Sequence, residues 1–270
     1  MRHGRRSLPR PLAVAVLLAV AVAFLTGAPA AGRVPGTPSR VLQLNLCDSG
    51  IATCYTGRAV ARAAAVIRSD APDVVTLNEI CQEDLYPLDR ALVEVYGGGT
   101  VVSAFRAAQD RRTGGDFHCR NGEPYGIGLL AHVPGPSARY STDGGVYPDQ
   151  DLRDPEERVW LCVYATGAFY ACATHLASTS ATVALAQCRY LLTTAIPDAR
   201  RSGGYRPTVL GGDLNLPDPR SCVPPGYLRR GDGGVQSVVA TDDFVVDAAR
   251  TVDMAGTTDH PGLLVTLTAG

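Results

Sequence analysis

Alternating apolar and polar positions, together with short runs of β-branched residues, predict a series of β-strands along the chain. The predicted strands span residues 41–46, 74–80, 125–132, 158–164, 168–175, 208–213, 235–240 and 263–267. Apolar residues at helical spacing predict helices over residues 58–68, 85–96 and 180–196. The strands 158–164 and 168–175 should form a hairpin about Gly167, whereas the polar stretches 109–124 and 134–157 are predicted to be loops.

This order of elements fits one domain. Many strands with interspersed helices predict an α/β (α+β) fold, arranged as a layered sandwich. The chain has 270 residues, and no internal repeat or change of composition divides residues 41–270. The preceding segment, 32–40, consists largely of Gly, Pro, Ser, Thr and Arg, and we expect it to be a linker.

Residues 1–31 have the pattern of a secretory signal peptide. Four arginines precede an apolar run from Pro11 to Leu25, and Ala28 and Ala30 form a small-residue cleavage pattern. The alternative is a membrane anchor, but this run is shorter than the roughly 20 apolar residues of a transmembrane helix. We therefore expect cleavage after residue 30 or 31 and a secreted, extracellular protein without a stable membrane span.

Eight cysteines follow the predicted signal, and an even number in an exported protein indicates disulfides. They are Cys47, Cys54, Cys81, Cys119, Cys162, Cys172, Cys188 and Cys222. Zinc is the alternative, but the chain has no C-x-x-C pair and no zinc-finger spacing of histidines. The short loop between Cys47 and Cys54 makes them the best local pair, and Cys81 with Cys119 is a plausible second pair. The other four cysteines allow three pairings. The first two bridges either brace loops of the candidate site or only stabilise surface loops.

The charge balance narrows the possible chemistry. All 25 basic residues are arginine, so a phosphate-loop lysine and a Schiff-base lysine are excluded. The formal net charge is −1, and removal of the signal takes away four arginines and no acidic residue. At a mature net charge of about −5, binding to a phosphate backbone needs local positive patches or a metal ion. Three arginine pairs are candidates for such patches: Arg111–Arg112, Arg200–Arg201 and Arg229–Arg230.

Five polar motifs stand mostly at the ends of apolar or small-residue runs. They are Asn45, Asn78-Glu79, Thr174-His175-Leu176, Gly211-Gly212-Asp213-Leu214-Asn215 and Thr258-Asp259-His260. Each alone has an ordinary interpretation: a turn former, an acidic residue at a helix start, a hydrogen-bonded histidine, a glycine turn or an Asx turn. Asparagine and histidine are scarce in this chain, however, and five such motifs in this order indicate a functional site.

The combination resembles the endonuclease/exonuclease/phosphatase superfamily, which has the deoxyribonuclease-I-like fold. The resemblance covers residues 41–268 and is most specific at residues 174–176, 212–215 and 258–260. Residues 125–130 are similar, less specifically, to the family's Gly-containing middle strand. The resemblance implies a four-layer α/β sandwich, with two mixed sheets face to face and helices outside. It also implies metal-assisted hydrolysis of a phosphate ester, here by a secreted bacterial member.

The resemblance assigns a metal site to three of the matched residues. Glu79 supplies a carboxylate for Mg²⁺, Mn²⁺ or Ca²⁺, ions that prefer oxygen ligands. Asn45 offers an amide oxygen near that ion, and Asp259 contacts the metal or holds its loop. Such an ion would polarise a phosphoryl oxygen and offset developing charge.

The other matched residues would carry out the proton and phosphate chemistry. Asp213 and Asn215, two apart past a glycine turn, position the attacking water and the phosphate. His260 is the candidate general base or charge stabiliser, and His175 donates a hydrogen bond to a phosphate oxygen. Histidine suits both roles because imidazole exchanges protons near neutral pH.

One position departs from the family's pattern. The family usually has an aspartate in a strand before the last Asp-His pair, where it orients the terminal histidine, and Gln236 occupies that place here. The amide oxygen of Gln236 can accept the ring N–H of His260, but it leaves the imidazolium without an ionic partner. Four acidic residues are alternative orienting groups: Asp242, Asp243, Asp247 and Asp253.

The sequence therefore predicts a secreted, divalent-metal-dependent phosphodiesterase, a monomer that acts on nucleic acid as a nuclease. A sphingomyelinase-like lipid phosphodiesterase, or a phosphatase, on the same fold is the second hypothesis. A lipid enzyme should expose aromatic residues on a loop, whereas Trp160 lies in a predicted strand and the 11 tyrosines leave the question open. A non-catalytic binding protein stapled by disulfides is the third hypothesis, and the presence of Glu79 and His260 counts against it.

Overall fold

Two six-stranded mixed sheets form the centre of the described chain. The computed structural model describes residue 1 and residues 40–135, 139–166 and 168–269. Apart from Met1, the predicted signal peptide over residues 1–31 lies outside the described residues, and so do residues 32–39 of the predicted linker and Gly167. Within the described ranges, no helix is both long enough and apolar enough to cross a membrane.

The first sheet contains β14, β15, β1, β2, β6 and β3 in that spatial order. The bounds of these strands are Phe244–Val252, Gly262–Ala269, Arg40–Asn45, Val74–Cys81, Tyr125–Val133 and Thr100–Ala107. β1 and β2 are parallel and place Asn45 opposite Asn78, while the other neighbouring strands are antiparallel.

The second sheet contains β12, β13, β11, β10, β9 and β7 in that spatial order. The bounds of these strands are Tyr227–Gly231, Gln236–Thr241, Thr208–Asp213, Phe169–His175, Val159–Ala165 and Tyr140–Val146. β10 and β11 are parallel and place His175 opposite Asp213, and the other pairs are antiparallel. A small third sheet joins β5, β4 and β8, with bounds Gly115–Asp116, Gln109–Asp110 and Glu156–Glu157.

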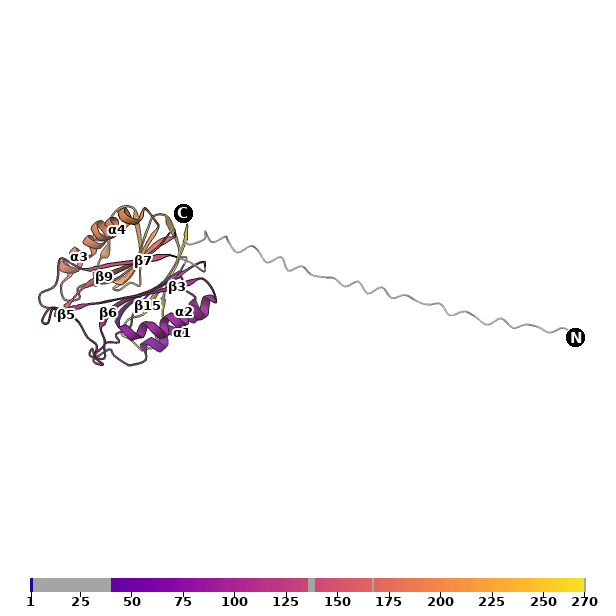
Figure 1. The fold of residues 1–270 in the computed structure, drawn as a ribbon, viewed down its shortest axis with the longest axis horizontal. Helices are drawn as coiled ribbons and strands as arrows, with labels where there is room; N and C mark the ends of the chain where they lie inside the picture. Colours follow the sequence, from indigo (N-terminus) through magenta and orange to yellow (C-terminus); the bar gives the residue numbers. More distant parts are fainter. Residues whose placement is uncertain (2–39, 136–138, 167, 270) are drawn as a thin grey trace. The chain divides into compact units, whose positions relative to one another are not determined.

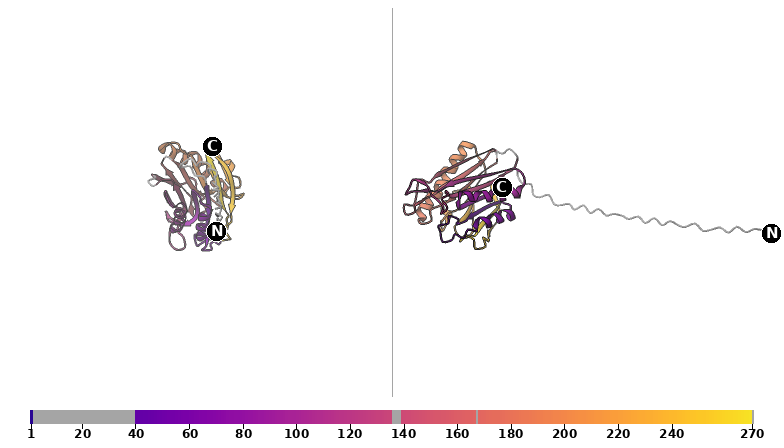
Figure 2. Two further views of the ribbon diagram at one scale, coloured as in Figure 1. Left: turned by 90° about the vertical axis from the view of Figure 1, so that its right-hand side faces the viewer. Right: turned by 60° about the horizontal axis from the view of Figure 1, so that its bottom comes forward.

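Helices cover the outer face of each sheet (Figures 1 and 2). The helices on the first sheet are α1, Ala59–Asp70, and α2, Leu85–Tyr96. The second sheet is covered by α3, Ala181–Tyr190, the π-helical turn η2, Leu191–Ala195, and α4, Ile196–Gly203. Two 3₁₀ turns complete the described elements, η1 at Gln82–Asp84 and η3 at Pro219–Ser221. The order helix, sheet, sheet, helix confirms the predicted four-layer sandwich.

The edge strands of both sheets are the strands that the sequence analysis does not assign. β3 and β14 flank the first sheet, and β7 and β12 flank the second. β7 and β8 lie inside the stretch 134–157, and β4 and β5 inside 109–124, so the prediction of uninterrupted loops there is wrong. An edge strand pairs on one side only, and the residues of β7 are exposed or half-buried. Such a strand lacks the apolar run that marks a central strand.

The predicted helix over residues 180–196 begins correctly but ends too early. Ser180 caps α3, because its hydroxyl accepts the backbone N–H of Val183 (3.4 Å). The helical path then continues through η2 and α4 as far as Gly203. Pro197 lies in the first turn of α4, where a missing N–H costs least. The other two predicted helices agree with α1 and α2 to within two residues at each end.

Gly211 and Gly212 lie within β11, which confirms the strand predicted over residues 208–213, and the expected turn comes after them. The two sheets approach each other closely at this point. A Cβ atom added to Gly211 would collide with the Thr76 hydroxyl of the facing sheet, and one added to Gly212 would collide with the Thr174 carbonyl. Glycine is therefore needed at both positions, at Gly211 to admit the Thr76 side chain and at Gly212 for close approach to the backbone of the neighbouring strand β10.

All eight cysteines lie in the described ranges, and all are paired. The disulfides are Cys47–Cys54, Cys81–Cys119, Cys162–Cys172 and Cys188–Cys222. The first two agree with the predicted pairs, and the last two settle the pairing that the sequence left open. Cys162 and Cys172 are direct register partners on β9 and β10. No thiol remains to bind zinc, so the zinc alternative has no cysteine ligand.

Candidate active site

The predicted site residues meet at one end of the sandwich, where both parallel strand pairs finish. β1 and β2 end at Asn45 and Cys81, and β10 and β11 end at His175 and Asp213. The carboxyl ends of parallel neighbours lie side by side, and here the two sheets bring two such pairs together. Asn45 hydrogen bonds to Asp213 across the sheets, and His175 lies 3.9 Å from Glu79.

Glu79 occupies a β-bulge in β2. Against β6, Asn78 pairs with Ile127 and Ile80 pairs with Gly126, so Glu79 is an extra residue in the ladder. Its backbone has a left-handed φ of 56°. Strict alternation would turn Glu79 away from the face that Asn78 occupies, and the bulge re-aims its carboxylate toward the site.

The amide of Asn45 links the two buried carboxylates of the site. Its Nδ2 donates hydrogen bonds to Glu79 Oε1 (2.8 Å) and to Asp213 Oδ2 (3.3 Å). Its Oδ1 accepts the backbone N–H of Cys47 (3.1 Å). The amide oxygen that was expected near a metal is thus paired with the backbone in this arrangement. Asn45 holds Glu79 and Asp213 together through its nitrogen.

Gln236 lies beneath the site and contacts Asp213. Gln236 Nε2 donates to Asp213 Oδ2 (3.2 Å), while Gln236 Oε1 accepts a hydrogen bond from Gln43 Nε2 (2.8 Å). The oxygen that was expected to accept the His260 ring N–H is therefore already paired. Among the described residues, no hydrogen bond joins Gln236 to His260, and both side chains lie next to Asp213 Oδ2.

The turn after β11 places Asp213 and Asn215 in one network. The Asp213 backbone N–H donates to Asn78 Oδ1 (2.8 Å), and its Oδ1 accepts the backbone N–H of Asn215 (3.0 Å). Asn215 has a left-handed φ of 48°, which asparagine tolerates better than most residues. Its side-chain nitrogen donates to the Leu176 carbonyl (3.0 Å), which ties this turn to the end of β10.

His175 is buried at the end of β10. Its Nδ1 lies 2.9 Å from NH1 of Arg158, and its Nε2 lies 3.9 Å from Glu79 Oε1. Burial, followed by the positive charge of Arg158, holds the pKa of His175 well below its usual value. The imidazole is therefore neutral at physiological pH.

His260 is more exposed and is carried by the loop before β15. Its side chain is 27% exposed, and its Nε2 lies 3.8 Å from Asp213 Oδ2 and 3.7 Å from Asp259 Oδ1. Asp259 itself is 53% exposed. The neighbouring Thr258 hydroxyl donates to the Asn45 carbonyl (3.0 Å) and fixes the loop to the end of β1. The carboxylates that face the His260 ring are therefore Asp213 and Asp259, not the four aspartates considered from the sequence.

An open cleft of about 520 Å³ brings five predicted residues to one surface: Glu79, His175, Asp213, Asn215 and His260. Asn45 and Gln236 are buried behind this lining, and Asp259 lies beside it. A larger hollow of about 810 Å³ lies between α2 and β3 and contains none of the predicted site residues.

The cleft is also lined by residues to which the sequence analysis assigned no role in the site. They are Tyr125, Arg153, Asp154, Pro155, Glu156, Arg158, Ser178 and Thr179. Burial raises the pKa of Glu156 to about 7, although the Arg158 guanidinium lies 3.0 Å away. The sequence offered a sign of Arg158, because a charged residue directly before the apolar run of β9 lies at the end of a buried strand, like the other site residues.

The donor set of the cleft suits a hard divalent cation. Burial raises the pKa of both Glu79 and Asp213. The protein's own groups therefore do not fully offset the cost of removing these two carboxylates from water. A cation bound by carboxylate oxygens would supply that compensation, and Mg²⁺, Mn²⁺ and Ca²⁺ prefer such ligands. The residues present therefore fit the predicted metal.

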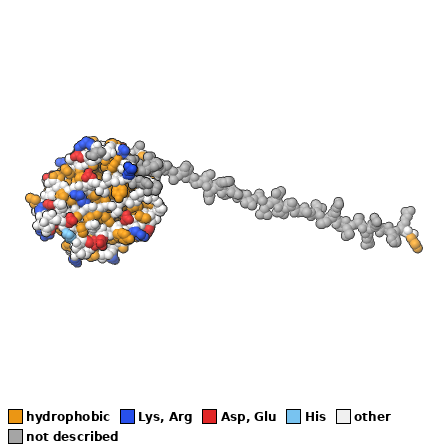
Figure 3. Space-filling model, in the orientation of Figure 1, with side chains coloured by type: hydrophobic (Ala, Val, Ile, Leu, Met, Phe, Trp, Pro, Cys, Tyr) orange, Lys and Arg blue, Asp and Glu red, His pale blue; other side chains and the backbone are white. Residues whose placement is uncertain are grey.

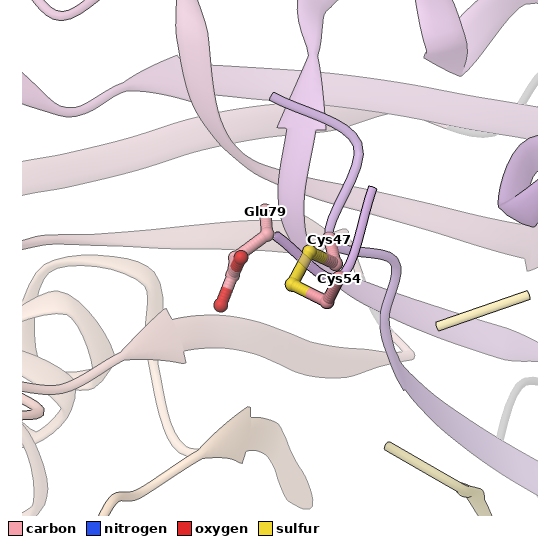
Figure 4. Close-up of side chains that lie close together, drawn as sticks. All are labelled: Cys47, Cys54 and Glu79. Atoms are coloured by element: carbon pink, nitrogen blue, oxygen red, sulfur yellow. A yellow bond between two sulfur atoms is a disulfide. The ribbon is translucent and has the colours of Figure 1, made fainter. Parts of the chain in front are cut away.

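The Cys47–Cys54 disulfide lies directly beside Glu79 (Figure 4). The two sulfur atoms and a Glu79 carboxylate oxygen lie within 4.8 Å of one another. Both sulfurs are covalently paired, so this cluster is a brace rather than a thiolate metal site. The second bridge, Cys81–Cys119, begins two residues after Glu79. Two disulfides thus fix the loops that follow β1 and β2.

The arginine pairs proposed from the sequence do not line the cleft, where the cations are Arg153 and Arg158. Most of the paired arginines have local partners: Arg111 with Glu157, Arg112 with Asp110, Arg201 with Asp198, Arg200 with Tyr205 and Arg229 with Ser237. On the face drawn in Figure 3, arginine and acidic side chains of the described residues are interspersed rather than separated by sign.

Comparison with known proteins identifies the family of the chain. The sequence profile of the Endonuclease/Exonuclease/phosphatase family matches residues 49–260. No curated protein sequence matches the chain.

Several solved structures share the fold. The endonuclease/exonuclease/phosphatase from Beutenbergia cavernae DSM 12333 has 23% identity and a TM-score of 0.61, over 86% of this chain and 72% of that chain. Truncated Caenorhabditis elegans TDP2 has 16% identity and a TM-score of 0.59, and the match covers 87% of this chain and 99% of that chain. The human Nocturnin catalytic domain with bound sulfate anion has 14% identity and a TM-score of 0.62, and the match covers 88% of this chain and 96% of that chain. At these identities the likeness shows the fold alone.

Proposed function

The chain belongs to the Endonuclease/Exonuclease/phosphatase family, a family of phosphoric ester hydrolases, and we propose that it is a secreted, divalent-metal-dependent phosphodiesterase that cleaves nucleic acid. One observation carries the proposal. Asn45 bridges the carboxylates of Glu79 and Asp213 at the floor of a cleft that His175 and His260 also line. Two carboxylates and two histidines in one cleft can hold a divalent ion, accept a proton from water and bind a phosphate oxygen, which are steps of phosphodiester hydrolysis.

The proposed metal site consists of Glu79 with Asn45 and Asp259. Glu79 is 19% exposed at its side chain, which leaves its carboxylate accessible from the cleft. When bound, a divalent ion polarises a phosphoryl oxygen and offsets the charge that develops on it. Asn45 restrains the Glu79 carboxylate through a 2.8 Å hydrogen bond, so the ligand is held in place before the ion binds.

The chain's own residues divide the remaining chemistry. His260 accepts a proton at a ring nitrogen from the attacking water, and the Asp213 carboxylate, 3.8 Å from Nε2, stabilises the imidazolium that forms. Asn215, fixed to Leu176, orients the phosphate. His175 donates a hydrogen bond to a phosphate oxygen from its side of the cleft. As the water oxygen bonds to phosphorus, the bond to the leaving oxygen breaks.

The choice of a nucleic acid substrate and of secretion rests on further features. Arg153, whose side chain is 69% exposed, places positive charge on the cleft wall, where an anionic strand would lie. The signal pattern over residues 1–31 and the four disulfides fit an extracellular protein, which we propose to act as a monomer.

A lipid phosphodiesterase is the second candidate, and exposed apolar side chains favour it. Ile51 and Tyr55 lie in and beside the Cys47–Cys54 loop and are 56% and 42% exposed, and Leu152, next to Arg153 of the cleft, is 84% exposed. Such residues could contact a membrane surface. Trp160, in contrast, is buried and offers no such contact.

A release assay on purified exported protein tests the proposal. The substrates are DNA, RNA, sphingomyelin vesicles and bis(p-nitrophenyl) phosphate, each with Mg²⁺, Mn²⁺ or Ca²⁺ and with a chelator. We expect cleavage of nucleic acid that the chelator abolishes. Glu79→Gln should lower the rate at least about a hundredfold, whereas Glu83→Gln, a change at an exposed glutamate, should not.

Each of the other possible outcomes of this assay would show that a different part of the proposal is wrong. Preferential release from sphingomyelin would favour the lipid enzyme. Cleavage that persists in chelator would remove the metal from the mechanism, and no release from any substrate would favour the non-catalytic binding protein.

A further inference from the structure

Arg158 is a buried cation with partners on several sides. It directly precedes β9, and its side chain is 5% exposed. NH1 lies 3.0 Å from Glu156 Oε1, and NH2 donates to Asp154 Oδ2 (3.1 Å) and to Ser178 Oγ (3.3 Å). These contacts fix the plane of the guanidinium.

The same guanidinium reaches His175. NH1 of Arg158 lies 2.9 Å from His175 Nδ1. A guanidinium has only N–H donors and does not lose its proton in proteins. His175 Nδ1 must therefore be the acceptor, which leaves the ring proton on Nε2. That nitrogen is the one 3.9 Å from Glu79 Oε1, on the side of the candidate catalytic carboxylates.

We propose that Arg158 is a positioning residue that fixes the ring of His175 and its tautomer, so that Nε2–H is presented to the cleft as a hydrogen-bond donor. The proposal rests on the proposed function insofar as the acceptor of this hydrogen bond is a phosphate oxygen. The assignment of the ring proton itself rests only on the contact between Arg158 and His175.

The two histidines of the cleft then differ because their partners have opposite charge. A carboxylate beside a histidine favours the imidazolium and supports a proton acceptor, and His260 has Asp213 and Asp259 within 4 Å. An arginine beside a histidine can only donate to it and supports a neutral ring whose other nitrogen is a donor. One histidine is thus suited to accept a proton and the other to bind an anion.

Nitrogen-15 NMR of histidine-labelled protein reads the tautomer without any turnover. In the metal-free wild type at pH 8, we expect a bare Nδ1 and a protonated Nε2 for His175, in a single form. The signal is assigned by its loss in His175→Gln. A proton on Nδ1, or an averaged mixture of tautomers, would overturn the proposal.

Substitutions at Arg158 test the cause of this state. Arg158→Lys retains an N–H donor and should keep the wild-type nitrogen-15 signals of His175. In Arg158→Met, the His175 ring should exchange between its two tautomers or rotate into the flipped orientation. Arg153→Met is the matched control, because it removes another cleft arginine that does not contact His175. An unchanged His175 spectrum in folded Arg158→Met would contradict the proposal. If the methionine variant does not fold, the spectra of the wild type and of Arg158→Lys still show whether the His175 ring proton is on Nε2.

A double-mutant cycle separates positioning from direct substrate binding. If Arg158 acts through His175, Arg158→Met should lower kcat/KM about tenfold or more in the wild type but less than about threefold in His175→Ala. An equal factor in both backgrounds would mean that Arg158 itself binds the substrate. If the tautomer is as expected but no phosphodiester is cleaved, the proposed function fails and the assignment of Arg158 stands.

Discussion

The layer between the two sheets is apolar at one end and polar at the other, and the change occurs within individual strands. Inward-facing residues of β1 run from Val41 through Gln43 to Asn45, and those of β11 run from Val209 through Gly211 to Asp213. At the first end Val41 and Val209 belong to a cluster of buried aliphatic and aromatic side chains. At the second end the side chains hydrogen bond to one another.

This difference separates two physical tasks. The apolar end stabilises the fold in proportion to the area it buries, without regard to which atoms meet. The polar end contributes little net stability, since its groups exchange water for one another, but each bond demands a particular partner. Gln43, for example, donates both to Asn78 on its own sheet and to Gln236 on the other. The polar end therefore sets the alignment of the sheets at the point where the candidate catalytic groups meet.

The largest expected effect is on activity at the polar end. His260→Ala should lower kcat/KM by about 10²–10⁴, the usual contribution of general acid–base catalysis. The unfolding temperature should change little, because the ring is 27% exposed and lies beyond hydrogen-bond distance of its neighbouring carboxylates. His118→Ala, a change at an exposed histidine, is the control. Equal losses in both variants would remove His260 from the site.

At the apolar end the expected effect is on stability instead. Phe169, at the start of β10, is 1% exposed, and Phe169→Ala should lower the free energy of unfolding by about 3–5 kcal/mol. The turnover of the fraction that remains folded should be close to that of the wild type. Urea unfolding combined with assays below the transition measures both quantities. A large loss of turnover in fully folded protein would show that the two ends are not separate.

Gln43→Leu should produce an intermediate effect on both properties. The leucine fills similar space but removes the donor to Asn78 Oδ1 and Gln236 Oε1. Asn78 Oδ1 keeps the backbone N–H of Asp213, whereas Gln236 Oε1 loses its donor, and a buried acceptor left unpaired costs about 1–3 kcal/mol. Turnover should also fall, because Asn78 and Gln236 hold Asp213 in place. Val41→Ala in the same strand is the comparison, since it should affect stability alone. If Gln43→Leu is as active and as stable as the wild type, the network does not align the sheets.

The smallest expected effect is on the pH dependence of stability, and it comes from Glu156 at the polar end. Burial raises the pKa of Glu156 from about 4.5 to about 7, so the folded state favours the protonated acid. The stability that this preference provides is full below pH 4.5 and is lost as the pH rises toward about 7. Glu156→Gln should flatten that fall in unfolding temperature between pH 4.5 and 7. A slope equal to that of the wild type would mean that folding does not raise the pKa of Glu156.

Central strands and motif positions were accessible from the sequence, and the edges of the sheets were not. All eight predicted strands lie in the interior of the two sheets, and the candidate catalytic motifs lie on or directly after them, where continuous burial produces a clear apolar pattern. The sequence left the pairing of Cys162 and Cys172 open, and only the register of β9 against β10 makes them partners. The exposed residues of β7 carry no comparable signal.

Alternation along the strands predicted a layered sandwich, and the polar motifs, through their resemblance to the family, predicted four layers and one cleft shared by the candidate residues. Only the tertiary structure decided which atoms meet: the bulge that turns Glu79, the pairing of Gln236 with Gln43 across 193 residues of sequence, and the contact of Arg158 with His175. The physical reason is the range of the interactions. Periodicity reports burial, which each strand experiences along its own length, whereas a buried hydrogen bond depends on the separation of two atoms to within a few tenths of an ångström. That separation is set by how the two sheets pack and not by either segment alone.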